Sequence, residues 1–151
     1  KLLIINIVER TPIIIINKND KSIFMDKNEL LLTVNEKSIT TFPVPVLSIL
    51  DDSINIQDNK NHISNIFKFI LSEYPEFYQN LSEIFIKSDS WEFHSDYKTK
   101  IITQNNNIKN QLIILKEFEK TVFPIRDLND YNYIDLRIKD QIIVKERFHK
   151  G

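Results

Sequence analysis

Glycine and cysteine are almost absent from this chain of 151 residues, which has no cysteine and a single glycine at its last position, Gly151. Phosphate-binding loops need glycines in motifs such as G-x-G-x-x-G, and the nucleophile elbow of hydrolases needs G-x-S-x-G. Neither motif can occur here. Without cysteine there is also no thiol nucleophile, no disulfide and no cysteine-ligated zinc. These absences exclude most familiar enzyme classes, and we predict no cofactor.

Histidine is scarce and dispersed, and the charge is balanced. The three histidines, His62, His94 and His149, lie far apart in the sequence, so the metal-binding motif H-E-x-x-H is absent. The chain has 20 basic and 21 acidic residues, for a net charge of -1. It therefore lacks the positive excess that is typical of proteins that bind nucleic acid, and we predict no nucleic-acid partner and no metal site.

The length suits one domain with a sizeable core. The apolar run at residues 2–8 is too short to span a bilayer, and no signal-peptide pattern is present. We expect the chain to be part of a longer protein.

Four short runs in the first part of the chain have the length and β-branched composition of strands. We predict strands over residues 2–8, 13–16, 21–25 and 30–34. Residues 42–46 are predicted to be extended, because each proline disfavours helix at the residue before it. The polar residues 51–61 are predicted to form a loop.

Two amphipathic patterns predict helices over residues 62–74 and 108–123, each followed by a proline. In the first, the apolar positions recur at helical spacing: Ile63, Ile66, Phe67, Ile70 and Leu71. Strands are predicted at residues 81–87, 91–95, 98–103, 131–138 and 141–147. The predicted fold is therefore α+β, a mostly antiparallel or mixed sheet with two main helices packed on it and a C-terminal hairpin.

The turn of this last hairpin sets which residues face each other. A two-residue turn at 139–140 would mix charged and apolar side chains on one face, whereas a three-residue turn at 139–141 separates them. The second register places the following residues opposite each other: Ile138 and Ile142, Leu136 and Val144, Asp135 and Lys145, Tyr133 and Arg147. We predict the second register.

The final strand is apolar on both faces at Ile142, Ile143 and Val144. A central strand covered by a helix has this composition. An edge strand with this composition would be a template for pairing with another chain. The residues alone leave both possibilities open.

Several motifs resemble those of the bacterial cell-division protein family FtsQ/DivIB. The run Glu9-Arg10-Thr11-Pro12-Ile13 resembles the E-R-x-P signature at the end of the family's POTRA module, and residues 22–26 resemble the Y-x-I-D that opens its β domain. The run Tyr133-Ile134-Asp135-Leu136-Arg137 is similar to Y-[IV]-D-L-R of the penultimate strand, and residues 141–146 resemble the V-V-V-K-E ending. The chain departs from the family where it has Asn28 and Asp140-Gln141 in place of glycines, and Ile138 in place of an aromatic residue.

This resemblance implies a fold, a function and a site. Residues 1–16 would be the last strand or strands of a POTRA-like module, 17–148 an FtsQ-like β domain and 149–151 a tail. The protein would be a non-catalytic divisome scaffold on the extracytoplasmic (periplasmic) face of the bacterial inner membrane, at the division septum, anchored by a transmembrane helix missing from this chain. It would bind FtsB/DivIC and FtsL by strand addition at the C-terminal strand. The implied partner-binding residues are Tyr133, Ile138, Asp140, Gln141, Ile142, Ile143, Val144 and Lys145.

Two other classes compete with this interpretation. A small metal-dependent hydrolase or nuclease could use Asp51-Asp52, or Asp89 with Asp96, as Mg²⁺ ligands. His94 could act as a base if Asp96 or Glu92 oriented it. Polar segments of this kind are more often solvated turns, so we predict no catalytic residue. A generic strand-addition module would share the final strand but not the family motifs.

Overall fold

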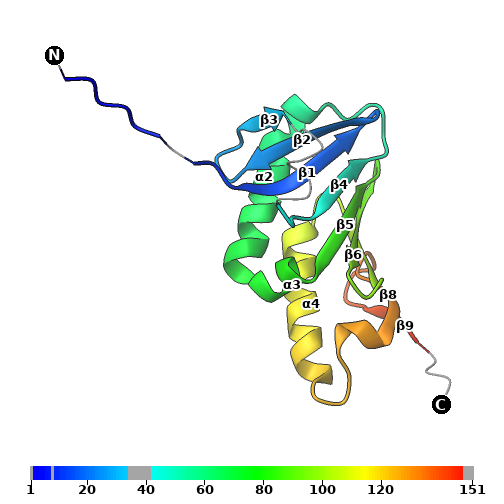
Figure 1. The fold of residues 1–151 in the computed structure, drawn as a ribbon. Helices are drawn as coiled ribbons and strands as arrows, with labels where there is room; N and C mark the ends of the chain where they lie inside the picture. Colours follow the sequence, from blue (N-terminus) through cyan, green and yellow to red (C-terminus); the bar gives the residue numbers. More distant parts are fainter. Residues whose placement is uncertain (1, 8, 34–41, 148–151) are drawn as a thin grey trace.

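The computed structural model describes residues 2–7, 9–33 and 42–147. Within these ranges the chain forms a nine-stranded mixed sheet with the strand order β3-β2-β1-β4-β5-β6-β7-β8-β9. Three helices pack against the sheet through one hydrophobic core (Figure 1). The prediction of an α+β fold with a mixed sheet is confirmed.

The strands and helices alternate irregularly along the chain. The strands are β1 (Pro12–Lys18), β2 (Lys21–Asp26), β3 (Leu31–Thr33), β4 (Val46–Ile49), β5 (Leu81–Ile86), β6 (Ser90–Ser95), β7 (Lys100–Gln104), β8 (Tyr131–Asp135) and β9 (Ile143–Glu146). The helices are α2 (Ile56–Glu73), α3 (Pro75–Gln79) and α4 (Ile108–Val122), with a short 3-10 turn at Leu128–Asp130. Strand pairs β1/β4, β4/β5 and β7/β8 are parallel, and the other neighbours are antiparallel.

The apolar stripes of the two predicted helices form the helical side of the core. Ile63, Ile66, Phe67 and Ile70 of α2 are buried, as are Ile108, Leu112 and Leu115 of α4. They pack against the strand residues that point to the same side, among them Trp91 and Phe93 of β6. Periodic burial therefore explains both helices.

Helix α2 begins earlier than the sequence predicts. It starts at Ile56, inside the segment 51–61 that we predicted to be a loop. Asn55 is the N-cap, and its side-chain oxygen accepts a hydrogen bond of 2.8 Å from the backbone N–H of Gln57. Ile56 packs partly against the core, but residues 57–62 are all polar, so the apolar pattern that marks the helix begins only at Ile63. The predicted loop over most of this segment is wrong.

The strand predictions were wrong at two places. Of the predicted strand 2–8, residues 2–7 have no regular structure and their aliphatic side chains are exposed, and residue 8 lies outside the described residues. A β-branched run has high strand propensity, but a strand also needs a neighbour to pair with. Strand β4 was missed because the prolines before it hide its alternating pattern. Strand β1 passes through the predicted domain boundary at residue 16 and pairs with both β2 and β4.

The scarcity of glycine has a direct structural effect on the turns. In the described part of the chain, five non-glycine residues have positive φ: Asn19, Asp20, Glu29, Lys98 and Asp140. Each holds a left-handed conformation that glycine adopts without steric cost. Three of the five are Asn or Asp, the side chains that tolerate this region best.

No helix in the described ranges is long and apolar enough to cross a membrane.

Candidate partner-binding edge

Strand β9 is the last strand of the sheet. It pairs antiparallel with β8, and no strand lies on its other side within residues 2–7, 9–33 and 42–147. All four of its residues are exposed, including the aliphatic side chains of Ile143 (38%) and Val144 (36%). The structure therefore selects the edge position over the covered central position that the sequence left open.

The backbone groups of β9 alternate between the two sides of the strand. The N–H of Arg147, next after β9, donates to the Asp130 carbonyl at 2.7 Å, so it points toward β8. Because successive residues in a strand point their N–H and C=O groups to opposite sides, Ile143 and Lys145 also bond toward β8. The N–H and C=O groups of Val144 and the N–H of Glu146 then point away from the sheet. The Glu146 carbonyl accepts a 3.3 Å hydrogen bond from the side chain of Asn132 in β8. These outward groups are the ones that an added strand would bond.

The register between β8 and β9 differs from our prediction by two residues. Val144 lies opposite Ile134, and Asp135 lies opposite Ile143. We had predicted Val144 opposite Leu136. The two side-chain faces are assigned as predicted, since a shift of two preserves them. The connection is longer, however: residues 136–142 form a loop in place of a three-residue turn.

Leu136 does not pair with β9, because its backbone groups bond β7 and α4 instead. Its N–H donates to the carbonyl of Ile102 in β7 at 2.9 Å, and its carbonyl accepts a 2.7 Å hydrogen bond from Gln111 Nε2. Gln111 lies on α4 and is 97% buried, and its Oε1 accepts from the N–H of Gln104 at 2.7 Å. The buried Gln111 side-chain amide bonds both the Leu136 carbonyl and the Gln104 N–H, and this fixes the start of the loop 136–142. Strand β9 begins only after this loop, where these contacts end.

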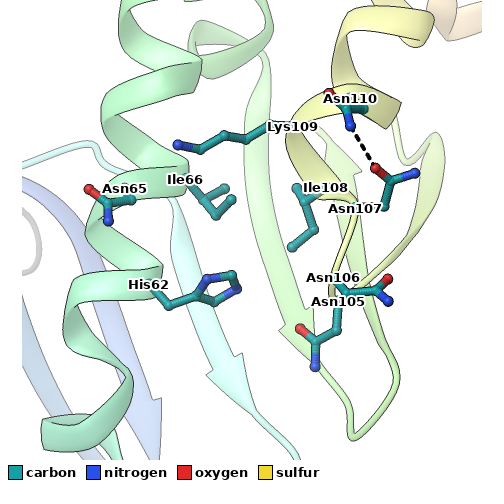
Figure 2. Close-up of a pocket in the computed structure, with 9 residues that line it drawn as sticks. All are labelled: His62, Asn65, Ile66, Asn105, Asn106, Asn107, Ile108, Lys109 and Asn110. Carbon is teal, nitrogen blue, oxygen red and sulfur yellow. Dashed lines mark hydrogen bonds between the residues drawn. The ribbon is translucent and has the colours of Figure 1, made fainter.

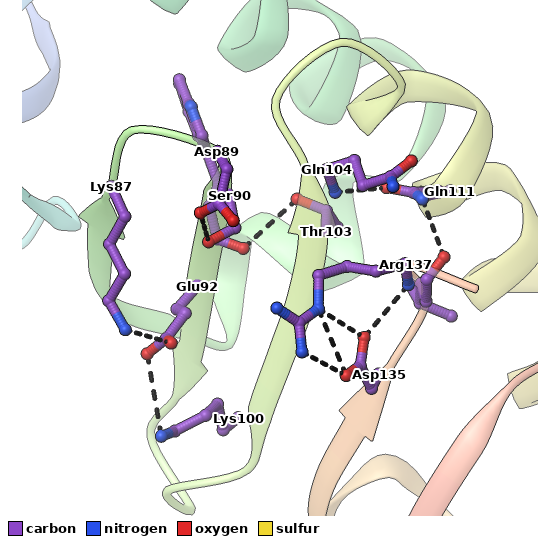
Figure 3. Close-up of polar contacts among 12 residues, drawn as sticks. Lys87, Asp89, Ser90, Glu92, Lys100, Thr103, Gln104, Gln111, Asp135 and Arg137 are labelled. Carbon is purple, nitrogen blue, oxygen red and sulfur yellow. Dashed lines mark hydrogen bonds and ion pairs between the residues drawn. The ribbon is translucent and has the colours of Figure 1, made fainter.

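An ion pair stiffens the same loop. Arg137 binds both carboxylate oxygens of Asp135: its Nε lies 2.9 Å from Oδ1 and its Nη2 lies 2.7 Å from Oδ2 (Figure 3). The Arg137 N–H also donates to Oδ1 at 3.0 Å. The hydrogen bond from Arg137 lowers the pKa of Asp135, against the opposing effect of burial. Farther along, the Gln141 N–H bonds the Ile138 carbonyl at 3.3 Å, across Asp140 with its φ of 59°.

The structure brings most of the predicted partner-binding residues to one edge. Ile138, Asp140 and Gln141 are exposed in the loop, and Ile143, Val144 and Lys145 are exposed on β9. Two residues differ from this pattern. Ile142 packs partly against the core, and Tyr133 lies one strand inside the edge, on β8.

The face of the sheet opposite the helices continues from this edge. Lys100 of β7, Tyr133 of β8 and Lys145 of β9 lie side by side in register, and so do Ile102, Asp135 and Ile143. None of these six side chains belongs to the buried core. The face next to β9 therefore has one row with two lysines and one row with two isoleucines.

Glu92 on β6 organises the charges farther across this face. Its carboxylate lies 2.5 Å from Lys87 Nζ and 3.7 Å from Lys100 Nζ (Figure 3). It also lies 3.6 Å from His94 Nε2. Burial acts to raise the pKa of Glu92, but the hydrogen bond from Lys87 and the charges of Lys100 and Lys87 outweigh it and leave the pKa lowered. One carboxylate is thus shared by three cationic or titratable partners.

Sequence reasoning missed two residues that position the edge. Gln111 was not singled out, although a polar residue within the apolar arc of a helix is a signal for a buried hydrogen bond. Arg147 was predicted only as a partner of Tyr133. Its side chain instead bonds the carbonyls of Tyr131 at 3.1 Å and Tyr97 at 2.6 Å, which fastens the end of β9 to the body of the domain.

The residues proposed for a metal-dependent enzyme do not converge. Asp51 accepts hydrogen bonds from the N–H and hydroxyl of Ser53, and Asp89 accepts one from Ser90. Within the described ranges no group of three or more His, Asp or Glu side chains could hold a metal ion. His94 does lie beside Glu92, but that carboxylate also pairs with Lys87 and Lys100.

A separate cleft lies between α2 and the start of α4. It has a volume of about 380 Å³, with Ile66 and Ile108 between walls formed by His62 and by asparagine side chains (Figure 2). Asn110 donates to Asn107 at 2.9 Å, and Asn105 donates to the Ser88 carbonyl at 3.2 Å. None of the predicted partner-binding residues lines this cleft.

The fold and the site together define an α+β domain with an exposed edge strand and one sheet face outside the helical core. No protein-family model and no curated protein matches the sequence. A solved structure with a similar arrangement is the major extracytoplasmic domain of the trans isomer of the bacterial cell division protein DivIB from Geobacillus stearothermophilus. The likeness covers 78% of this chain and 91% of that chain, with a TM-score of 0.47 and 15% identity.

Proposed function

We propose that this chain is a non-catalytic scaffold domain of the bacterial cell-division machinery and that it binds partner division proteins by strand addition to β9. The partners would be FtsB/DivIC-like and FtsL-like proteins, which support septum formation. The domain would lie on the periplasmic face of the inner membrane. A transmembrane helix and a POTRA-like module ending within residues 1–16 would precede it, with the β domain at 17–148 and a tail at 149–151.

The exposed position of β9 is the observation on which the proposal depends. An edge strand with free backbone groups pairs readily with another chain, and proteins usually protect such edges with charges, prolines or bulges. β9 carries the charges of Lys145 and Glu146 at its far end and its ladder with β8 is irregular near Tyr131, but it has no proline and exposes Ile143 and Val144. The Y-I-D-L-R run, residues 133–137, lies beside this edge and resembles the motif of the penultimate strand in the FtsQ/DivIB family.

The geometry also supports a division of roles within the site. The N–H and C=O of Val144 and the N–H of Glu146 would supply outward backbone groups for the ladder with the partner strand. Ile143, which lies beside Asp135 on the open face, would contact apolar side chains of the partner. Tyr133 and Lys145 would extend this contact from the edge onto the open face.

Two proline substitutions test strand addition, because they remove N–H groups that point in opposite directions. Val144→Pro should abolish binding and leave the free domain folded, because the lost N–H points away from β8. Ile143→Pro should instead destabilise the domain, because its N–H points toward β8. Val144→Thr keeps the N–H and the β-branched shape and should keep most of the affinity. Binding would be measured by calorimetry with the extracytoplasmic segments of FtsB/DivIC-like and FtsL-like proteins from the same genome, and folding by circular dichroism.

Amide exchange gives an independent measurement. Partner binding should protect the amides of Val144 and Glu146, which point outward, more than those of Ile143 and Lys145. If Val144→Pro folded and bound these partners normally, β9 would not be the docking strand. Unchanged exchange across β9 in a saturated complex would have the same meaning.

A further inference from the structure

Lys145 is a cation without an ion partner at the proposed docking edge. It is exposed on β9 and lies on the face of the sheet opposite the helices, in register with Tyr133. In the part of the chain that the structure describes, no carboxylate lies within ion-pair distance of its Nζ. The next residue, Glu146, is on the other face of β9 and is paired with Arg126 at 3.6 Å.

The other charges on this face near the edge are neutralised within the domain. Arg137 binds both carboxylate oxygens of Asp135. Lys100, in the same row as Lys145, lies 3.7 Å from the carboxylate of Glu92. Among these charges, Lys145 is the one that is left for a partner to neutralise.

Strand addition would bring a side chain directly against Lys145. Residues opposite each other on neighbouring strands have Cβ atoms about 4.5–5.5 Å apart. In an antiparallel addition, Val144 and the N–H of Glu146 would make the hydrogen bonds, so Lys145 would be in a non-hydrogen-bonded pair, in which the two side chains lie closest. Removing water from an ammonium group is unfavourable unless an opposite charge replaces the water. The charge of the residue opposite Lys145 therefore affects whether a strand can bind.

The two residues that precede Lys145 set a different requirement. Ile143 lies in register with Asp135, whose charge is already paired. Val144 lies in register with Ile134, which is fully buried. Both are aliphatic and partly exposed, so aliphatic side chains opposite them would be covered along with them. The edge thus presents one cation next to two aliphatic side chains.

We propose that β9 selects a partner strand with an acidic residue opposite Lys145 and aliphatic residues at the next two positions, opposite Val144 and Ile143. This inference rests on the proposed function, because it specifies the chemistry of the strand that adds to β9. The partner's carboxylate replaces the water that Lys145 loses. A strand with a neutral residue at that position leaves the cation unpaired, and one with a basic residue adds repulsion, so β9 discriminates against both.

Charge exchange between the two strands tests this selection. The probes are the extracytoplasmic segments of the FtsB/DivIC-like and FtsL-like proteins from the same genome, with binding measured by calorimetry at low and high salt. In this chain, Lys145→Gln removes the charge and Lys145→Glu reverses it. Lys27→Glu is the matched control, because Lys27 is exposed in the turn after β2, near the other end of the sheet. In the probe, each Asp and Glu whose amide is protected in the complex is changed to Lys, one at a time.

Lys145→Gln should weaken binding about tenfold and Lys145→Glu about 100-fold, and Lys145→Gln should also reduce the dependence of affinity on salt. Lys27→Glu makes the same change in net charge and should alter the affinity less than about twofold. One change of an acidic residue to lysine in the probe should restore binding to Lys145→Glu and weaken binding to the parent chain. Circular dichroism would confirm that all variants are folded.

The outcomes separate this inference from the proposed function. If Lys145→Glu bound as well as Lys27→Glu while Val144→Pro abolished binding, strand addition would stand and the charge selection would be overturned. A loss of affinity in Lys145→Glu that no probe variant restores would also overturn the charge selection. If the parent chain bound neither probe, the proposed function itself would fail, and this inference with it.

Discussion

Strands β8 and β9 are neighbours in one sheet, yet they are stabilised in different ways. β8 lies between β7 and β9, and Tyr131 and Ile134 are almost fully buried. β9 is paired on one side in the described structure, and all of its residues are exposed. The free energy that holds β8 comes from burial, whereas β9 depends on one backbone ladder and on the side chain of Arg147. The comparison indicates that the inner strand specifies the fold and that the outer strand is available for binding.

The largest expected difference between the two strands is in core packing. Ile134→Ala should lower the free energy of unfolding by about 2–5 kcal/mol, because it leaves a cavity at a fully buried site. The matched change in β9, Val144→Ala, should cost less than about 1 kcal/mol, because that side chain is partly exposed. Urea denaturation would measure both. Similar losses in the two variants would mean that β9 is as important to the fold as β8.

A second expected effect is at the contact that ends β8. Gln111→Leu should lower the free energy of unfolding by about 1–3 kcal/mol, because it leaves the Leu136 carbonyl and the Gln104 N–H without their partner. It should also increase amide exchange in the loop 136–142. Gln111→Glu retains an acceptor for Gln104 and would separate the two contributions. If Gln111→Leu left loop exchange unchanged, Gln111 would not position the edge.

The third effect is a loss of stability in acid. Arg137 lowers the pKa of Asp135 in the folded chain, so as the pH falls the unfolded state takes up this proton first. The stabilisation is complete above the unfolded pKa of about 3.9 and is lost as the pH falls through the lower folded value. Asp135→Asn should therefore reduce the dependence of stability on pH below about pH 4. Thermal melting across this range would measure it, and identical slopes would contradict the assignment.

The smallest expected effect is in the loop between the two strands. Asp140 has positive φ, and Asp140→Gly should change the free energy of unfolding by at most about 1 kcal/mol, in the stabilising direction. Lys139→Gly is a matched control, because Lys139 is not among the positive-φ residues and should lose stability. Differential scanning calorimetry would detect both changes. A destabilised Asp140→Gly variant would show that the Asp140 side chain has a role beyond the turn.

The fold was predictable wherever burial leaves a periodic pattern. The helical stripes through Phe67 and Leu112, and the pairing of β5, β6 and β7, follow from such patterns. The start of α2 at Ile56 does not, because residues 57–62 are all polar and only Ile56 packs against the core there. Residues 2–7 show the opposite error, since their propensity for strand is high but no neighbour pairs with them.

The candidate edge was predictable in composition but not in geometry. The sequence indicates which residues of β9 are apolar and on which face each lies. It does not indicate that Gln111 and Ile102 bind Leu136, and those two long-range contacts move the register by two residues. The edge position of β9 also depends on the order of all nine strands, which local patterns do not determine.

The alternation of backbone groups along β9 has a consequence for inhibitor design. A strand added to β9 would use every second residue to bond Val144 and the N–H of Glu146, and its remaining N–H and C=O groups would form a new free edge. A peptide N-methylated at those remaining positions would keep its bonds to β9 and offer no donors on its outer side. Such a peptide should bind β9 and prevent any further strand from adding at this edge. It could be designed from main-chain geometry before the natural partner's sequence is known.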